Sequence, residues 1–159
     1  MKKLFLLCLT AGLILLAKTE TQAQTTYKNA IGGRFGEANG VTFKTFVNRE
    51  DALDFILNFQ STGHFSYFRL TGLYEVHKPI HNAEGLRYYY GGGATLGSRR
   101  DKRTDDSDLL ASVDGVIGLD FKFDGAPINL ALDWKPALVI TPGTGFDARG
   151  LGLSVRFTF

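Results

Sequence analysis

The sequence has a single cysteine, Cys8, so a disulfide within the chain is excluded and stability must come from elsewhere. Long apolar runs are scarce as well. The longest extends from Leu4 to Ala17 and is interrupted by Thr10 and Gly12. A membrane-spanning helix needs about 20 apolar residues, so this run is too short for one. Beyond it the chain has no helical periodicity, which leaves strands as the expected elements.

The first residues have the layout of a secretory signal peptide. Lys2 and Lys3 give a basic start before the apolar run, and Thr21-Gln22-Ala23 supplies small residues where a signal peptidase requires them. We therefore expect residues 1–23 to be a cleaved helical signal peptide. Residues 24–159 are expected to form one domain.

Neither sign of charge is in excess once this signal peptide is removed. It contains three of the 18 basic residues and one of the 16 acidic residues, so 15 of each remain in the mature chain. Nucleic-acid-binding domains usually carry a basic excess, so no nucleic-acid partner is expected.

Alternation of apolar and polar residues dominates the mature chain, and this pattern is typical of half-buried strands. The separators contain turn-forming residues, of which Ala38-Asn39-Gly40 is the clearest example. Eight strands are predicted: Thr26–Gly36, Val41–Val47, Ala52–Gln60, Tyr67–His77, Leu86–Gly97, Leu110–Phe123, Ile128–Ile140 and Arg149–Phe159.

After the first connection, short and long connections alternate. Short turns are predicted at Asn48–Asp51, Lys78–Gly85 and Asp124–Pro127, and longer connections at Ser61–Ser66, Ser98–Asp108 and Thr141–Ala148. Outer-membrane barrels show this asymmetry, with short periplasmic turns and longer outer loops. With both termini in the periplasm, the three longer connections fall on the outer side.

Each predicted strand divides by parity into an apolar face and a polar face. The apolar face carries aromatic and aliphatic residues, beginning with Tyr27, and its only clear polar members are Asn29 and Thr45. The other face combines small residues with twelve charged ones: Arg34, Lys44, Asp54, Arg69, Glu75, Arg87, Asp114, Asp120, Lys122, Asp133, Lys135 and Arg156.

This alternation alone fits either a water-soluble barrel with an apolar core or a membrane barrel with an apolar outer surface. An eight-stranded interior is just wide enough to be filled by side chains, and the apolar set is too large and aromatic for it. Small residues on the charged face also suit a crowded lumen. We therefore predict an all-β, eight-stranded antiparallel up-and-down transmembrane β-barrel whose apolar face meets lipid.

The closing segment Leu151–Phe159 supports this prediction. It alternates apolar residues, ends on an aromatic and places Val155, Phe157 and Phe159 on one face. In this it resembles the terminal strand of outer-membrane proteins, which implies that these three residues form the signal read by the barrel assembly machinery. In length and strand count, the mature chain resembles the small OmpA/OmpX-type barrels. The resemblance implies a location in the outer membrane of a Gram-negative bacterium.

The charges predicted to face the lumen comprise seven basic and five acidic side chains. An unpaired buried charge costs several kcal/mol, so this near balance predicts pairing across a plugged interior. A narrow conducting pore is the alternative interpretation of the same face.

The predicted outer connection Ser98–Asp108 contains Arg99, Arg100, Lys102 and Arg103 among four aspartates. Arginine and lysine at this height could pair with the phosphates of lipopolysaccharide. A solvated loop of mixed charge accounts for the same composition.

Two further segments offer residues with catalytic or metal-binding chemistry. His64, with Ser61 and Ser66, supplies the base and nucleophile of a lipid-modifying enzyme, although no acidic residue nearby in sequence would orient the histidine. His77 and His81 flank a turn that offers too few further ligands for a metal site. We expect no catalytic residues, no bound metal and no cofactor.

Pro136 lies inside the seventh predicted strand, where it cannot donate a hydrogen bond to a neighbour. A bulge or an early strand end would accommodate it. The alternative is a lateral gap in the barrel wall through which an apolar ligand enters.

The expected function is a structural or surface-interaction role, exercised by a monomer in outer-membrane lipid whose outer loops meet lipopolysaccharide. Transport of small apolar molecules through a gap near Pro136 and lipid modification are the two alternatives. The barrel assembly machinery is the partner expected during insertion.

Overall fold

The computed structural model describes residues 27–61, 64–104 and 106–159, and the predicted signal peptide lies outside them. In these segments no helix is long and apolar enough to cross a lipid bilayer. The strands are β1 (Asn29–Gly36), β2 (Gly40–Phe46), β3 (Asp51–Ser61), β4 (Phe65–Pro79), β5 (Leu86–Asp101), β6 (Ser107–Lys122), β7 (Ile128–Trp134), β8 (Ala137–Thr141), β9 (Gly145–Asp147) and β10 (Leu151–Thr158).

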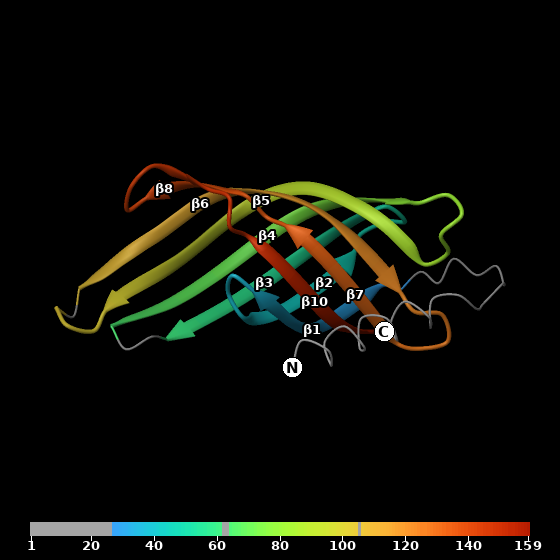
Figure 1. Cartoon of the computed structure of the whole chain (residues 1–159), viewed down its shortest axis with the longest axis horizontal. Helices are drawn as coiled ribbons and strands as arrows, with labels where there is room; N and C mark the ends of the chain where they lie inside the picture. Colours follow the sequence, from blue (N-terminus) through green and yellow to red (C-terminus); the bar gives the residue numbers. More distant parts are fainter. Residues whose placement is uncertain (1–26, 62–63, 105) are drawn as a thin grey trace, which may run out of the picture.

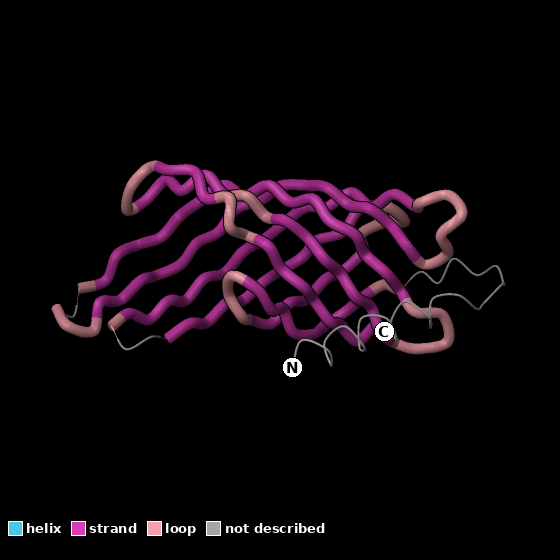
Figure 2. Tube along the Cα trace, viewed as in Figure 1, coloured by secondary structure: helices cyan, strands magenta, loops and turns pink. Residues whose placement is uncertain are grey.

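These strands form one closed antiparallel sheet, seen from the side in Figures 1 and 2. From β1 to β6 each strand pairs with the next, β6 pairs with β7 and β8, and β10 pairs with both β7 and β1. Because β7 and β8 follow one another along β6, they occupy one position in the wall, as do β9 and β10. The wall therefore has eight positions, and the prediction of an eight-stranded antiparallel barrel is confirmed.

The wall is apolar outside and polar inside. Along β10, exposed and buried residues alternate without interruption, and β7 alternates in nearly the same way. Leu153 and Phe157 are exposed on the outer surface, whereas Ser154 and Arg156, which lie between them in the sequence, are buried. Lipid covers such an apolar surface in membrane barrels, whereas in water it would be left unburied.

A small apolar cluster also lies inside the barrel. It comprises Ile56, Leu73, Tyr89, Val116 and Ala131, which come from five different strands. The interior is therefore packed with both apolar and polar side chains, as expected for a barrel of this size.

The barrel wall is higher on one side than on the other. At the end opposite Tyr27 and Phe159, the first and last described residues, the β1–β2 hairpin stops at residues 36–40. The β3–β4 and β5–β6 hairpins extend well beyond it, at the left of Figure 1. The prediction that Ser98–Asp108 forms one long loop is wrong, because Arg99 pairs with Asp108 and Arg100 with Ser107. Polar residues continue the backbone ladder there, since pairing needs only backbone groups once the strands leave the apolar zone.

The wall is locally irregular at Pro136, between β7 and β8. Gly115 N donates to Pro136 O at 2.9 Å, but proline has no N–H to return the bond. On the opposite side, Lys135 N donates to Gly150 O, and the next registered pair is Ala137 with Asp147. Pro136 alone therefore lies opposite two residues, Ala148 and Arg149. This arrangement is a β-bulge at residues 148–149.

Asn29, Thr45 and Tyr27, which lie near one end of the barrel, were all predicted to lie on the apolar face. Asn29 and Thr45, its polar members, are cross-strand partners, and Thr45 Oγ1 donates to Asn29 Oδ1 at 2.9 Å. Tyr27 was assigned to the same face, and this is wrong: its hydroxyl donates to Asp120 at 3.3 Å, and its ring packs on Phe46. Tyr27 precedes β1, so strand parity does not determine its direction.

Candidate functional site: a charge network in the lumen

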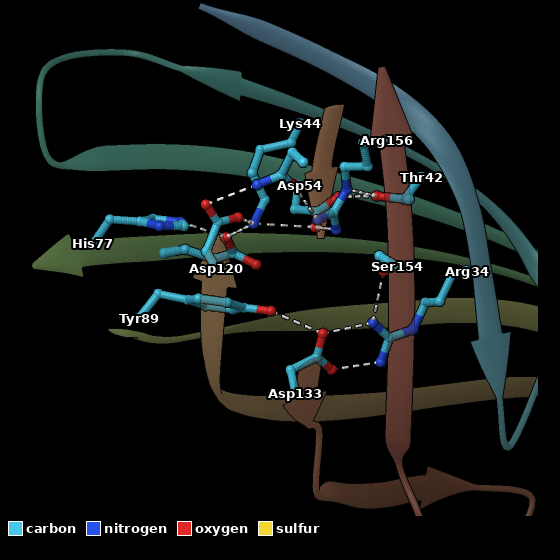
Figure 3. Close-up of polar contacts among 12 residues, drawn as sticks. Arg34, Thr42, Lys44, Asp54, His77, Tyr89, Asp120, Asp133, Ser154 and Arg156 are labelled. Atoms are coloured by element: carbon cyan, nitrogen blue, oxygen red, sulfur yellow. Dashed lines mark hydrogen bonds and ion pairs between the residues drawn. The ribbon is translucent and has the colours of Figure 1, made fainter. Parts of the chain in front are cut away.

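The buried polar residues of the interior come from strands all round the barrel. Figure 3 shows them converging from opposite walls onto the same region of the lumen. The fully or almost fully buried charged residues are Arg34, Lys44, Asp54, Glu75, Asp114, Asp120, Asp133 and Arg156, all at or below 5% exposure. Strand parity explains this convergence, because every second residue of each strand points inward.

The first group of contacts centres on Asp133. Arg34 from β1 donates to both its oxygens, at 2.5 and 2.7 Å, in a bidentate pair. The hydroxyl of Tyr89 donates to the same carboxylate at 2.8 Å. Bidentate, charge-assisted bonds of this kind are strong and fix geometry, so this group ties β1, β5 and β7 together.

Arg156 is the centre of the second group. It donates to Asp54 at 2.7 Å, to the Thr42 hydroxyl at 3.1 Å and to Asn129 at 3.4 Å. Thr42 in turn donates to the other oxygen of Asp54 at 2.6 Å. These contacts join β10 across the lumen to β2, β3 and β7.

Lys44 connects this second group to the end of the barrel that carries the termini. Its ammonium group lies 2.6 Å from Glu75, 3.7 Å from Asp54 and 3.9 Å from Asp120. It also lies 4.4 Å from the centre of the Tyr89 ring, a cation–π distance. A single cation thus faces three carboxylates from three strands, which compensates part of their desolvation cost.

Aromatic rings pack together beside Lys44. His77 stacks on Tyr89 with ring centres 4.7 Å apart and meets Phe46 edge-on at 4.9 Å. His77 Nε2 lies 2.9 Å from the Glu75 carboxylate, so the histidine belongs to the network. In the described segments, no group of three or more His, Cys, Asp or Glu side chains could hold a metal ion.

A third group lies nearer the opposite end, around Asp114. Ser112 donates to Asp114 at 2.8 Å, Thr95 donates to its other oxygen, and Lys135 lies 3.4 Å away. Thr71 contacts Thr95 through their hydroxyls at 2.6 Å. Two hydroxyl groups and one ammonium group thus surround this carboxylate.

Two glycines make room for the bulkiest network members. A Cβ on Gly152 would collide with the guanidinium group of Arg34. At Gly118 it would collide with Asp133 and with the Tyr89 ring. Both glycines are needed because the lumen of an eight-stranded barrel has little spare volume.

Cavities occupy the two ends of the lumen, and the network lies between them. A cavity of 90 Å³ borders Arg34, Thr71 and Lys135 on the side away from the termini. A wider one, of 650 Å³, borders Tyr27, His77 and other residues at the end that carries the termini.

The remaining charges predicted for the lumen lie at its ends, half-buried. Arg69 lies 3.8 Å from Glu37, and the Arg87 guanidinium lies 5.8 Å from the Phe46 ring centre. Lys122 donates to the carbonyl oxygens of residues 123 and 126 instead of to a carboxylate. Eight of the twelve charged residues predicted for the lumen are thus buried inside it. The other four, Arg69, Arg87, Lys122 and Lys135, lie at its ends.

Sequence reasoning did not assign Tyr89, His77, Asn129 and Thr42 to the network. The signal that could have identified them was their parity, because each shares the inward face of its strand with a predicted charge. His77 had instead been considered with His81 as residues flanking a turn. His77 is the buried one of the two, because β4 continues to Pro79.

Three of the four basic residues near the β5–β6 tip contact different neighbours. Arg99 lies over the Tyr67 ring at 5.6 Å, and Lys102 donates to the Ser61 hydroxyl at 2.9 Å. Arg103 lies 3.2 Å from His64 Nε2. The lipid-modifying enzyme stays a hypothesis, and its loop residues 62 and 63 lie outside the described segments.

Two further predicted sites have a defined place in the wall. Val155, Phe157 and Phe159 are all exposed on the outer surface, and their role as an assembly signal stays a prediction. At Pro136 the strand is interrupted while β7 and β8 keep one register along β6. The lateral gap proposed there also stays a prediction.

The rim outside the apolar belt carries an exposed ion pair. Arg149 donates to both oxygens of Asp147, at 3.0 and 3.1 Å. These hydrogen bonds are the main reason that the pKa of Asp147 lies below its ordinary value. This pair offers a solvent-exposed counterpart to the buried arginine–aspartate pairs.

No protein-family model matches the chain, and no curated protein resembles it in sequence. Solved structures do resemble it. The N-terminal β-barrel domain of Pseudomonas aeruginosa OprF superposes with a TM-score of 0.64 at 16% identity, over 87% of this chain and 100% of that one. Neisserial surface protein A gives a TM-score of 0.51 at 10% identity, over 82% of this chain and 93% of that one. The chain therefore has the fold of small outer-membrane β-barrels.

Proposed function

We propose that this protein is a structural outer-membrane β-barrel of a Gram-negative bacterium, with a closed polar lumen and outer loops that meet lipopolysaccharide or surface partners. The observation that carries the proposal is the bonded network between the two lumen cavities. Such a network supports the barrel wall from within, and it favours a lumen closed to solutes.

The strength of the network supports a closed lumen. A solute the size of a hydrated ion would have to separate Arg34 from Asp133 or Arg156 from Asp54. Separating one such buried pair without new partners costs about 3–5 kcal/mol. Both pairs are at most 6% exposed, so water at either mouth does little to compensate.

The outer surface supports the membrane location. Its exposed apolar side chains include aromatic residues at both ends of the strands, among them Phe35, Phe59, Tyr88 and Phe157. Lipid-facing bands with aromatic girdles characterise outer-membrane barrels. Exposure of such a band to water would favour aggregation instead.

Single-channel recording in planar bilayers tests the closed lumen. We expect the folded wild-type protein to give no stable conductance steps in salt solution. Arg34→Ala combined with Asp133→Ala removes the first group and should create measurable conductance. The matched control, Arg149→Gln, removes an arginine whose side chain is 81% exposed and should leave the barrel closed. Steady conductance by the wild type would contradict the proposal.

Two associations belong to the same proposal. The barrel is expected to act as a monomer, because the sheet closes on itself and leaves no long edge for a second copy. The basic residues at the β5–β6 tip are expected to meet lipopolysaccharide. Extraction of the protein with the outer-membrane fraction, together with heat-modifiable gel migration, checks the location on which both depend.

A further inference from the structure

The outer surface of four neighbouring strands changes character in three successive rows. Strand pairing places one residue of each of β3, β4, β5 and β6 in every row. Nearest the middle of the barrel the row is Leu57, Leu70, Leu96 and Ala111; the next is Phe59, Phe68, Ser98 and Leu109; the last is Ser61, Ser66, Arg100 and Ser107.

These rows record the boundary of the apolar zone. The first is wholly apolar, the second is three-quarters apolar, and the third is wholly polar. Leu96, Phe68 and Leu109 are exposed on the outer surface, which fixes the direction of the first two rows. Successive rows lie about 7 Å apart, so the surface changes from hydrocarbon-like to polar within one headgroup layer.

The polar row has the donors that recognise a phosphate. Arg100 stands between Ser66 and Ser107 as their direct cross-strand partner, and such partners have Cβ atoms about 5 Å apart. Its guanidinium group carries N–H donors in a planar fork that matches the oxygens of a phosphate. Lys102 adds a second cation to the row, because its ammonium group donates to the Ser61 hydroxyl at 2.9 Å.

Arg99, the adjacent basic residue, belongs to the opposite face. It pairs across the hairpin with Asp108 and lies over the Tyr67 ring. The alternation of the strand thus separates two neighbouring arginines: Arg100 lies on the face that continues the apolar belt, and Arg99 on the face that continues the lumen.

We propose that the row formed by Ser61, Ser66, Arg100 and Ser107, together with Lys102, binds the phosphate group of a membrane lipid. The acyl chains of that lipid lie against the two apolar rows directly beneath. This proposal rests on the proposed function, because it requires the apolar belt to be embedded in lipid. The continuity of the polar row with that belt favours a lipid phosphate over a free one.

Lipid binding to the folded, detergent-solubilised full-length protein tests the proposal by native mass spectrometry. The probes are a short-chain phosphatidic acid, diacylglycerol with the same chains, and inorganic phosphate. Phosphatidic acid should bind about tenfold more tightly than either of the others, because charge-assisted bonds and apolar contact then act together. Arg100→Gln should lower its affinity about tenfold, and the control variant Arg149→Gln, an exposed arginine outside this row, should leave it unchanged.

Heat-modifiable migration of each variant shows that it is folded and separates this proposal from the proposed function. If Arg100→Gln does not fold, Lys102→Gln replaces it, with a several-fold loss expected. Equal affinity for phosphatidic acid and diacylglycerol would overturn the proposal, as would equal losses from the two arginine variants. Equal binding of inorganic phosphate would show an anion site without a lipid. In each case a heat-modifiable barrel would leave standing the proposal of a structural outer-membrane barrel with a closed lumen.

Discussion

Replacing Arg156 by methionine should destabilise the barrel more than any exposed substitution. The methionine keeps a similar length while removing the charge that faces Asp54 at 2.7 Å. It also removes the hydrogen bonds from the guanidinium group to Thr42 and Asn129. Asp54, only 1% exposed, then keeps its bond from the Thr42 hydroxyl and the ammonium group of Lys44 at 3.7 Å.

The magnitude follows from that arrangement. Removing one partner of a buried ion pair costs about 3–5 kcal/mol, and the remaining contact with Lys44 places Arg156→Met near the lower limit. A loss of about 3 kcal/mol changes the unfolding equilibrium by more than a hundredfold. The double variant Arg156→Met with Asp54→Leu should recover most of the loss, because no buried charge is then left unpaired.

Arg149→Gln is the matched control, because Arg149 also forms a hydrogen-bonded pair with an aspartate, Asp147. Its side chain is 81% exposed, so its removal should cost at most about 1 kcal/mol. Urea unfolding in phospholipid vesicles, followed by heat-modifiable migration, compares the three variants with the wild type. If Arg156→Met costs no more than Arg149→Gln, burial of the network does not stabilise the barrel as argued.

Two further predictions concern the lumen wall and the rim. Gly152→Ala should lower the free energy of unfolding by about 1–3 kcal/mol, because the added Cβ meets the Arg34 guanidinium. Gly143→Ala, which has open space around it, should change this free energy little. Equal urea midpoints for the two variants would contradict the steric argument. The pKa of Asp147 is lowered mainly by hydrogen bonds from Arg149, so their small contribution to stability is present at neutral pH and disappears as the pH falls through that lowered pKa. Arg149→Gln should raise the pKa of Asp147 toward its ordinary value, as carboxyl carbon NMR would record, and an unchanged titration would refute the assignment.

The sequence was sufficient to predict the barrel because its pattern is local. Alternation defines both the strands and their two faces, and one-residue errors in register would move charges into lipid. This also explains how barrels with 16% and 10% identity share the fold, since many sequences satisfy the same alternation.

The contacts within the lumen could not be predicted in the same way. Parity indicates that Arg34 and Asp133 point inward, but their pairing depends on the relative height of β1 and β7, which a third strand sets. The end of β5 was predicted too early and the start of β6 too late, because polar residues such as Arg99 and Arg100 continue the backbone pairing between these strands. Tyr27 was misplaced because parity carries no information outside a strand.

Trp134 allows the most direct test of the central claim, that the apolar face meets lipid. It is the single tryptophan of the chain and is 42% exposed on the outer surface. In vesicles whose acyl chains carry bromine, its fluorescence should be strongly quenched, while aqueous acrylamide should have little effect. Efficient quenching by acrylamide, with none by the brominated chains, would show that this face meets water and would contradict the account.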